Sequence, residues 1–445
     1  MRLRSLHPAQ LVVLAFAVAI LVGTLLLLLP VARAGAGAGG ASFLTALFTA
    51  TSAVCVTGLV VVDTPTYWSP TGQAVILGLI QAGGFGIMAL TSLLALLVAR
   101  RLGLRTRLLA QAETKALRLG DVRRVLLGVA LLSVLFELVT ALVLSGRLYL
   151  AYDYPLGSAV WHGGFHAVSA FNNAGFSLWS DSLAGFVTDG WISLAVIGAV
   201  IAGGLGFPVW IELARRRFSF RRWSIHTKLT LSVTLVLLVV GTASVLLFEW
   251  SQPATLGGLG VTGKLLAGFF QGVMPRTAGF NSLDYGELQP ETLLVTEILM
   301  FIGAGSGSTA GGIKVTTVAL LALMVYAEVR GDPTVNAFGR RIPGIAQRQA
   351  FSIAAIALAA VVTGTLLLMA TSPHTFGSTL FEAVSAFGTV GLSTGITGDV
   401  SGPGKVVLIA LMFLGRTGPY TLFIALVLRE RRRRYEYPEE RPIIG

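Results

Sequence analysis

The sequence contains eight apolar stretches that are each long enough to cross a lipid bilayer, and this feature limits the possible folds more than any other. A helix needs about 20 apolar residues to span a bilayer. Because the hydrocarbon core holds no water to satisfy backbone groups, such stretches must be helical. The first is too long for the core of a typical signal peptide, so we expect a helix there as well. The stretches lie near residues 10–30, 73–98, 125–146, 190–212, 229–248, 292–328, 351–370 and 405–428. The sequence predicts an all-α multi-spanning membrane protein.

Composition agrees with this class. Of the 445 residues, 54% are hydrophobic and 12% are charged, the latter about half the usual share in soluble proteins. These values exclude an ordinary soluble enzyme and a disordered chain. The net charge of +12 would also be typical of a nucleic-acid-binding protein, but the basic residues lie between apolar stretches. We therefore expect basic cytoplasmic loops and no nucleic-acid partner. The single cysteine excludes an intramolecular disulfide.

The basic residues also predict the orientation. They cluster on the same side of successive crossings, whereas the intervening loops carry few basic residues and several acids. By the positive-inside rule, both termini lie in the cytoplasm and the protein resides in the cell membrane. The acidic outer loops favour arriving cations, and the basic tail is expected to contact membrane lipids. The basic clusters are Arg2 with Arg4, residues 100–124, residues 215–228, residues 330–348, and the chain from Arg429 onward.

Four outer loops repeat one pattern. Each contains a short apolar segment, near 42–53, 158–171, 262–274 or 377–387, that is too short to cross. A glycine follows each segment, with a phenylalanine ten residues before it and a Leu or Phe directly after it; these glycines are Gly58, Gly175, Gly279 and Gly391. A fourfold repeat of helix, pore loop and helix predicts a pseudo-fourfold pore around a central axis. The expected repeats are 1–124, 125–222, 223–348, and 349–445 with its basic tail.

The glycine turns suit the binding of a dehydrated monovalent cation. Backbone carbonyls can replace the water shell of such an ion without a full charge that would trap it. Glycine permits the irregular backbone this requires, and the C-terminal end of each short helix would point its partial negative charge at the ion. We expect Arg276 to turn away from the pore and pair with an outer acid. The expected selectivity filter comprises Val56, Thr57, Gly58, Asn173, Ala174, Gly175, Thr277, Ala278, Gly279, Thr389, Val390 and Gly391.

A run of small residues at 303–312 interrupts the sixth apolar stretch and is the expected gate. Its soft backbone suits an element that moves between two states. The alternatives are a kink that lets helices pack closely or a dimer face made of small residues. Arg416 lies near the middle of the last stretch, where a charge costs at least ~2.5–3.5 kcal/mol, so we expect it to contact this run and hold it across the pore. Lys314 is assigned a similar role. The expected gate residues are Gly303, Gly305, Ser306, Gly307, Ser308, Thr309, Gly311, Gly312, Lys314 and Arg416.

Four motifs together resemble the Trk/Ktr/HKT potassium transporter superfamily, most closely its KtrB-like branch, over nearly the whole chain. They are Val-Thr-Gly-Leu at 56–59, Asn-Asn-Ala-Gly-Phe at 172–176, Arg-Thr-Ala-Gly-Phe at 276–280 and Thr-Val-Gly-Leu at 389–392. The resemblance implies potassium bound at the filter carbonyls, a homodimer with one pore per subunit, and a cytosolic ring of KtrA-like nucleotide-binding regulatory subunits. Some members couple potassium to sodium. No G-x-G-x-x-G follows a strand in this sequence, so the nucleotide sensor would be another chain.

Two other functions fit a multi-spanning chain. An alternating-access cation carrier would share the apolar stretches, and a lipid-modifying membrane enzyme would need acids or histidines clustered near one membrane face. The sequence shows no such cluster, no transition-metal ligand spacing and no motif for an organic cofactor. We therefore expect a transport protein and not an enzyme.

Overall fold

The protein is almost entirely helical, as the sequence predicts. The computed structural model describes residues 8–35, 39–101, 120–216 and 219–428. Within these residues the strands are β1 (Asn336–Ala337) and β2 (Arg340–Arg341), which pair as an antiparallel hairpin. Of the basic clusters, Arg2, Arg4, positions 102–119 and the tail from Arg429 lie outside the described residues.

The helices follow one another as four units, each with a long helix, a short helix and a second long or broken helix. The first unit has α1 (Pro8–Leu27), α2 (Phe43–Val54) and α4 (Pro70–Arg101). The second has α6 (Gly120–Ala151), α7 (Leu156–Phe171), α8 (Gly190–Leu205) and α9 (Phe207–Arg216). The third has α10 (Ile225–Glu249), α11 (Val261–Val273), α12 (Pro290–Phe301) and α13 (Val315–Arg330). The fourth has α14 (Gly344–Thr371), α15 (Phe376–Gly388) and α16 (Gly402–Leu428).

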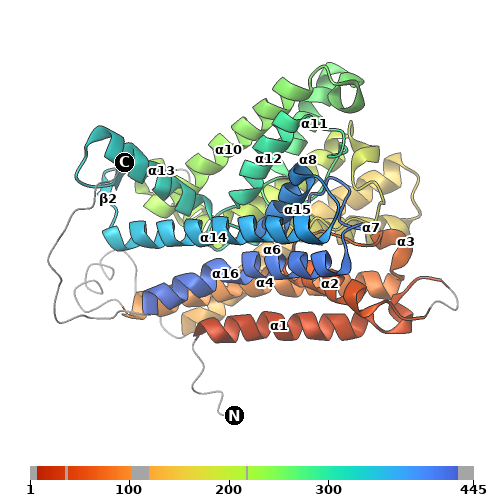
Figure 1. Ribbon diagram of the computed structural model, residues 1–445, viewed down its shortest axis with the longest axis horizontal. Helices are drawn as coiled ribbons and strands as arrows, with labels where there is room; N and C mark the ends of the chain where they lie inside the picture. The colour runs from red at the N-terminus through yellow and green to blue at the C-terminus, as the bar shows by residue number, and fades with distance from the viewer. Residues whose placement is uncertain (1–7, 36–38, 102–119, 217–218, 429–445) are drawn as a thin grey trace, which may run out of the picture.

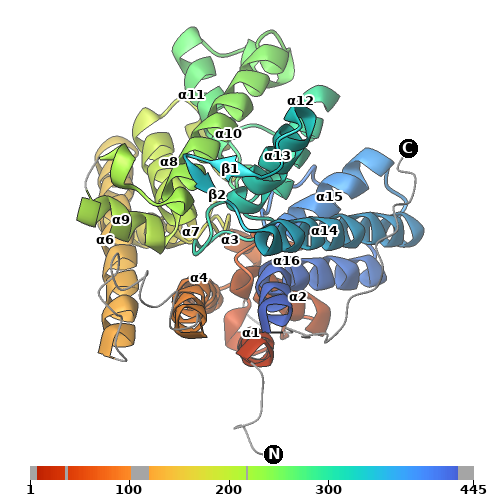
Figure 2. The same cartoon turned by 90° about the vertical axis from the view of Figure 1, so that its left-hand side faces the viewer.

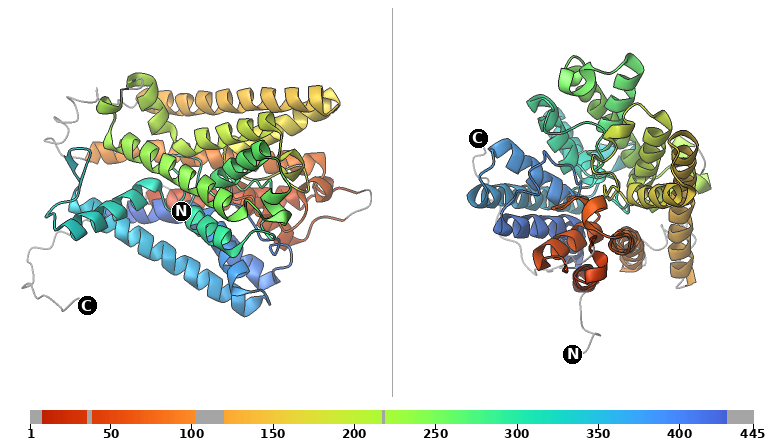
Figure 3. Two further views of the ribbon diagram at one scale, coloured as in Figure 1. Left: turned by 90° about the horizontal axis from the view of Figure 1, so that it is seen from above. Right: turned by 90° about the vertical axis from the view of Figure 1, so that its right-hand side faces the viewer.

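The four short helices α2, α7, α11 and α15 begin and end within two residues of the short apolar segments expected from the sequence, which confirms those predictions. Smaller helical turns occur in the connections: α3 (Thr64–Tyr67), η2 (Pro30–Ala32), η3 (Ala184–Phe186), η4 (Phe220–Arg222) and η5 (Pro253–Gly257). Seen along the longest axis of the molecule, the units succeed one another around the structure (Figure 2), and the view from the opposite end agrees (Figure 3). The fourth unit lies next to the first, because α16 packs against α1 and α2.

Not every one of the eight expected crossings is a single continuous apolar helix. Among the described residues, five helices are long and apolar enough to span a membrane, namely α1, α4, α6, α10 and α14, or six if the bent pair α8–α9 counts as one span. The other two expected crossings are α12 with α13, separated by the non-helical residues 302–314, and α16. The chain is therefore a multi-pass membrane protein in which two of the expected crossings are interrupted. Figure 1 shows α12 and α13 as separate helices.

The stretch 190–212 is not the single helix that its apolar length indicates. It bends by 92° between α8 and α9. At the bend, Gly206 has φ 88° and ψ 147°, a conformation that is accessible mainly to glycine. A Cβ placed on Gly206 would lie 2.9 Å from the carbonyl oxygen of Ser306, so the bend also makes room for the loop between α12 and α13.

In three of the four units, a glycine on the second long helix allows the end of the short helix to approach that helix unusually closely. A Cβ placed on Gly83 of α4 would lie 2.0 Å from the carbonyl oxygen of Val54, at the end of α2. Equivalent contacts occur at the ends of α7 and α15. Small residues let helix backbones approach one another in membrane proteins, so these glycines fix the depth of the short helices. The equivalent distances are 1.8 Å from Gly203 to Phe171 O and 1.7 Å from Gly415 to Phe387 O.

We predict that Gly83→Ala lowers the free energy of unfolding by about 1–3 kcal/mol, because the added methyl group overpacks the contact with α2. Gly86→Ala is the matched control: it lies on the same helix, and a Cβ there meets nothing within 4 Å. The control should be neutral or slightly stabilising, since alanine is the better helix former by about 1 kcal/mol. The measurement is thermal unfolding of the detergent-solubilised protein; equal melting temperatures for the two variants would contradict the proposed contact.

Candidate functional site

The four glycine turns share one backbone conformation. In each turn two residues have a positive φ: the glycine and the residue two positions before it. A non-glycine residue in this region costs about 1–3 kcal/mol and is usually held there by its surroundings at functional sites. The φ values are 58° and 94° for Val56 and Gly58, 60° and 68° for Asn173 and Gly175, 65° and 74° for Thr277 and Gly279, and 50° and 94° for Thr389 and Gly391.

The turns meet in a closed ring, although more than 100 residues separate each from the next in the sequence. A Cβ placed on any one glycine would collide with the carbonyl of the residue before another filter glycine. The series runs through all four turns and returns to the first, so the turns surround a common axis. The distances are 2.4 Å from Gly58 to Ala174 O, 2.9 Å from Gly175 to Ala278 O, 2.3 Å from Gly279 to Val390 O, and 2.1 Å from Gly391 to Thr57 O.

The ring is rich in oxygen atoms that have no protein partner. In the described part of the chain, the carbonyls of Thr57, Ala174, Ala278 and Val390 accept no hydrogen bond. The buried hydroxyls of Thr57, Thr277 and Thr389 also lack partners among these residues. Buried polar groups are normally satisfied, and an unpaired one is explained by a bound ion or water. Neutral oxygens without a fixed charge suit a monovalent cation, so the residues present fit such an ion.

Serines support three of the four turns from the short helices, and the sequence analysis missed them. The hydroxyl oxygens of Ser52 and Ser385 accept hydrogen bonds from the backbone N–H of the filter glycines, at 3.1 Å in each case. Ser169 donates to Phe176 O at 2.8 Å. Each serine lies six residues before its glycine, so the aligned repeats do contain the signal. The third repeat has Val273 in this position and lacks the support.

Arg276 anchors the third turn instead. Its guanidinium donates to the carbonyl oxygen of Thr234 at 3.1 Å and to the Thr234 hydroxyl at 3.3 Å. Thr234 belongs to α10, and no acid lies within ion-pair distance of Arg276 among the described residues. The expected pairing with an outer acid is therefore wrong, because the side chain runs toward the middle of α10.

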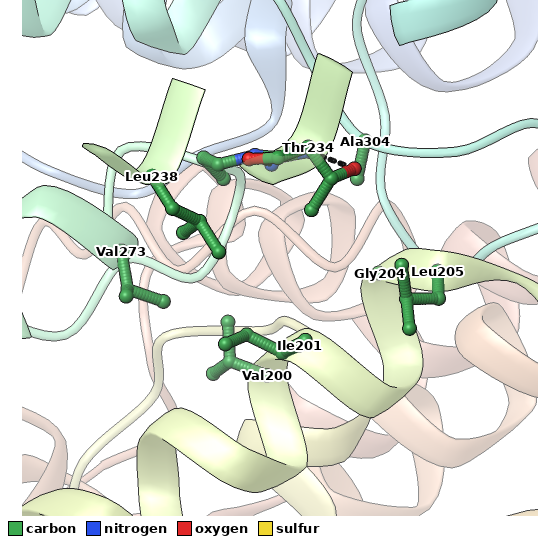
Figure 4. A pocket seen from close by; sticks show the side chains of 9 residues that line it. Val200, Ile201, Gly204, Leu205, Thr234, Leu238, Val273 and Ala304 are labelled. Carbon is green, nitrogen blue, oxygen red and sulfur yellow. Dashed lines mark hydrogen bonds between the residues drawn. The ribbon is translucent and has the colours of Figure 1, made fainter. Parts of the chain in front are cut away.

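A small cavity of about 20 Å³ adjoins this arginine (Figure 4). It is large enough for about one water molecule. Most of its lining is apolar and comes from α8, α10, α11 and the loop after α12. Its lining reaches from Val273 and Arg276, before the third filter turn, to Gly204 and Leu205, before the bend after α8. Its lining comprises Val200, Ile201, Gly204, Leu205, Thr234, Leu238, Val273, Arg276 and Ala304.

The small-residue run forms a buried loop against α8. Gly305 N donates to Gly204 O at 2.9 Å, and Thr309 N donates to Gly203 O at 3.3 Å. In return, Phe207 N donates to Gly307 O at 3.2 Å. Within residues 303–314, Ser306 is partly exposed and the rest are buried. The loop therefore continues the third unit through the interior of the molecule, without regular helix.

The same loop contacts two turns on opposite sides of the ring. The Thr309 hydroxyl donates to Phe171 O at 3.3 Å, directly before the second turn. A Cβ placed on Gly311 would lie 2.0 Å from the Thr389 hydroxyl of the fourth turn. The second and fourth turns are not neighbours in the ring, so the loop spans the space between them.

Two buried cations hold this loop. Arg416 donates to the carbonyl oxygen of Thr309 and, at 3.2 Å, to that of Gly83. Lys314 donates to the carbonyl oxygens of Ala310 and Gly311, the latter at 3.2 Å. Both side chains are almost fully buried. Carbonyl oxygens thus accept hydrogen bonds from both side chains, and the structure brings all the expected gate residues into one region.

Comparisons with known proteins agree with this geometry. The model of the family described as "TrkH: Cation transport protein" matches residues 4–434. The Ktr system potassium uptake protein B of Bacillus subtilis (strain 168) is 40% identical over 438 residues, which are 98% of this chain and 97% of that protein. The potassium/sodium uptake protein NtpJ of Enterococcus hirae is 36% identical and covers 99% of this chain and 98% of its own length.

The fold is also similar to a solved structure. The potassium transporter TrkH from Vibrio parahaemolyticus has a TM-score of 0.71 over 97% of this chain and 86% of that chain, at 20% sequence identity. At this identity the likeness concerns the fold alone. The match to the family model over nearly the whole chain, and the relative that is 40% identical, identify a membrane transport protein. The chain belongs to the TrkH family of cation transport proteins, which confirms the resemblance found in the sequence.

Proposed function

We propose that this protein takes up potassium ions through a filter formed by the four glycine turns. The observation that carries the proposal is the closed ring, in which four oxygen-rich turns surround one axis. Oxygen atoms at the ring replace the water shell of a dehydrated potassium ion without a full negative charge that would hold it. The names of the Bacillus subtilis and Enterococcus hirae relatives, which both include potassium uptake, support this choice of ion.

The loop at 303–312 is the proposed gate. In the arrangement seen here it lies between the second and fourth turns, and the two cations Lys314 and Arg416 bond its carbonyls. Positive charge near the ring opposes the passage of a cation, and the effect is large where water is excluded. Opening requires the loop to leave this position, which breaks its bonds to α8 and to Arg416. The short side chains of the loop leave little bulk to move.

Regulation is assigned to a separate subunit. The Ktr names of the relatives describe a system with more than one component. We therefore propose a cytosolic KtrA-like ring that binds nucleotide and moves the loop, together with a homodimer of this chain. Both termini would face the cytoplasm of a cell-membrane protein, as the basic clusters indicate. Sodium dependence is a separate property of the proposed transport, and the name of the Enterococcus relative, which contains sodium, is the reason to measure it.

The first test is uptake itself. Expression together with a KtrA-like partner should restore growth of a potassium-uptake-deficient cell at low external potassium, because the filter admits the dehydrated ion. Flux into liposomes containing the purified chain, with and without sodium and the partner, measures the ion dependence directly. Well-inserted protein that moves no potassium with its partner present would refute the proposed function.

Glycine substitutions test the filter. We predict that Gly391→Ala lowers selectivity for potassium over sodium at least about tenfold, equivalent to roughly 1.4 kcal/mol, because the methyl group displaces the Thr57 carbonyl. Gly398→Ala is the control in the same outer loop: its φ is not positive, and its nearest contact is 3.8 Å away. The ratio of potassium to sodium flux in liposomes is the measurement. The filter assignment fails if Gly391→Ala and its equivalents at the other three glycines all keep the parental ratio.

Two changes test the gate. Arg416→Ala removes hydrogen bonds from a charged group to two carbonyls, which are typically worth about 1.5–3 kcal/mol each. We therefore expect basal flux in the absence of the regulatory subunit to rise about tenfold or more. Deletion of 305–311 should raise it as well, because it removes the bridge between opposite turns. Parental flux in both variants, at equal amounts of inserted protein, would show that the loop is not the gate.

A further inference from the structure

Two buried titratable side chains occupy one equivalent position in opposite repeats. The position lies on the short helix, nine residues before the filter glycine. The second and fourth repeats carry His166 and Glu382 there, and both side chains are fully buried. The other two repeats carry Thr49 and Phe270. Burying an ionisable group is costly unless its hydrogen bonds are made, so each should be held by specific partners.

Both side chains bond to the segment directly after the filter glycine. His166 Nε2 lies 3.1 Å from the Ser177 hydroxyl and accepts from Leu178 N at 3.2 Å. The Ser393 hydroxyl donates to one carboxyl oxygen of Glu382. Ser177 and Ser393 are equivalent, since each lies two residues after its glycine. Two different side chains therefore make the same link across the turn.

Each link extends into a fixed network. In the second repeat, His166 Nδ1 lies 2.7 Å from the carbonyl oxygen of His162, which can only accept, so Nδ1 carries the proton and Nε2 is the acceptor. The indole of Trp179 stacks on this imidazole with 3.9 Å between ring centroids. In the fourth repeat, the second carboxyl oxygen of Glu382 accepts from the Thr397 hydroxyl at 3.0 Å. The orientations of both side chains are thus fixed by several partners.

The first and third repeats lack this link. Val60 and Asn281 stand where the other repeats have serine. In the described part of the chain, no hydrogen bond joins Thr49 to the segment after Gly58, and the Phe270 side chain has no polar atom to donate or accept one. The third repeat instead uses the next residue of the short helix: Gln271 donates to Leu283 O at 3.4 Å and accepts from the Tyr285 hydroxyl at 2.9 Å. Because the second and fourth turns are opposite one another in the ring, the links to the serine two residues after the glycine lie on two opposite sides of the filter.

We propose that His166 and Glu382 are positioning residues that set the ion selectivity of the filter. They fix the backbone immediately outside two opposite glycine turns, and thereby the places of the carbonyls that replace the water of the ion. Functional geometry of this kind depends on displacements of about 0.5 Å, and it is held by the hydrogen bonds behind it. The proposal rests on the proposed function, because selectivity has meaning only if the ring conducts ions.

The test replaces each residue and measures selectivity separately from rate. His166→Phe introduces the residue of the third repeat, and Glu382→Leu removes the carboxyl group. In both variants the ratio of potassium to sodium flux should fall about tenfold, with a smaller change in maximal potassium flux. Glu382→Gln keeps an acceptor for Ser393 and should retain most of the selectivity. Thr49→Val is the control at the same position of the first repeat, and its ratio should stay within about twofold of the parent.

Two serine variants keep the test valid if His166→Phe or Glu382→Leu fails to fold. Ser177→Ala and Ser393→Ala each remove a partner of the buried group and should lower the ratio in the same direction. If Ser393 acts through Glu382, adding Ser393→Ala to Glu382→Leu should lower the ratio no further. Parental selectivity in folded variants of both repeats would overturn the proposal while leaving the proposed function intact. A parent chain that conducts no potassium with its partner present would overturn both.

Discussion

The approach of four glycine turns is the contact on which the rest of the structure depends. No side chain fits between neighbouring turns, because an added Cβ would lie within 3 Å of the next carbonyl. Non-helical backbone at membrane depth is tolerated only where protein buries it or where it lines a water-filled path. The ring meets this condition because the four short helices and their partners enclose it. Glycines of α4, α8 and α16 then let the ends of the short helices reach the required depth.

The third unit departs from the others, and its departures are connected. Its second crossing is broken, and the loop at the break fills the space between opposite turns. The bend after α8 exists where this loop passes, since Gly206 leaves room for Ser306. The third turn also has no supporting serine and relies on Arg276, which reaches α10. One unit thus carries the proposed gate, and the neighbouring crossing is bent where the loop passes.

Much of the fold follows from the sequence, because apolar length and glycine spacing are local signals. The short helices and the four turns were predicted by these signals alone. The partners of Arg276 and the bend at Gly206 were not, because both depend on contacts between segments far apart in the sequence. Thr234 lies 42 residues from Arg276, and the loop bonds Phe171 from 138 residues away. Such contacts leave no periodic pattern, whereas the aligned serines at 52, 169 and 385 did leave one.

A filter made from one chain can be supported differently on each side, which four identical subunits cannot achieve. The backbone of the four turns is nearly the same here, yet the groups behind them differ. Serine supports three turns and an arginine anchors the remaining one, while His166 and Glu382 add links on two opposite sides. Unequal support nevertheless accompanies a common backbone conformation in all four turns. The pseudo-symmetry therefore holds for the backbone around the axis. The side chains behind this backbone differ between repeats, so they can set the proposed selectivity and the proposed gating independently.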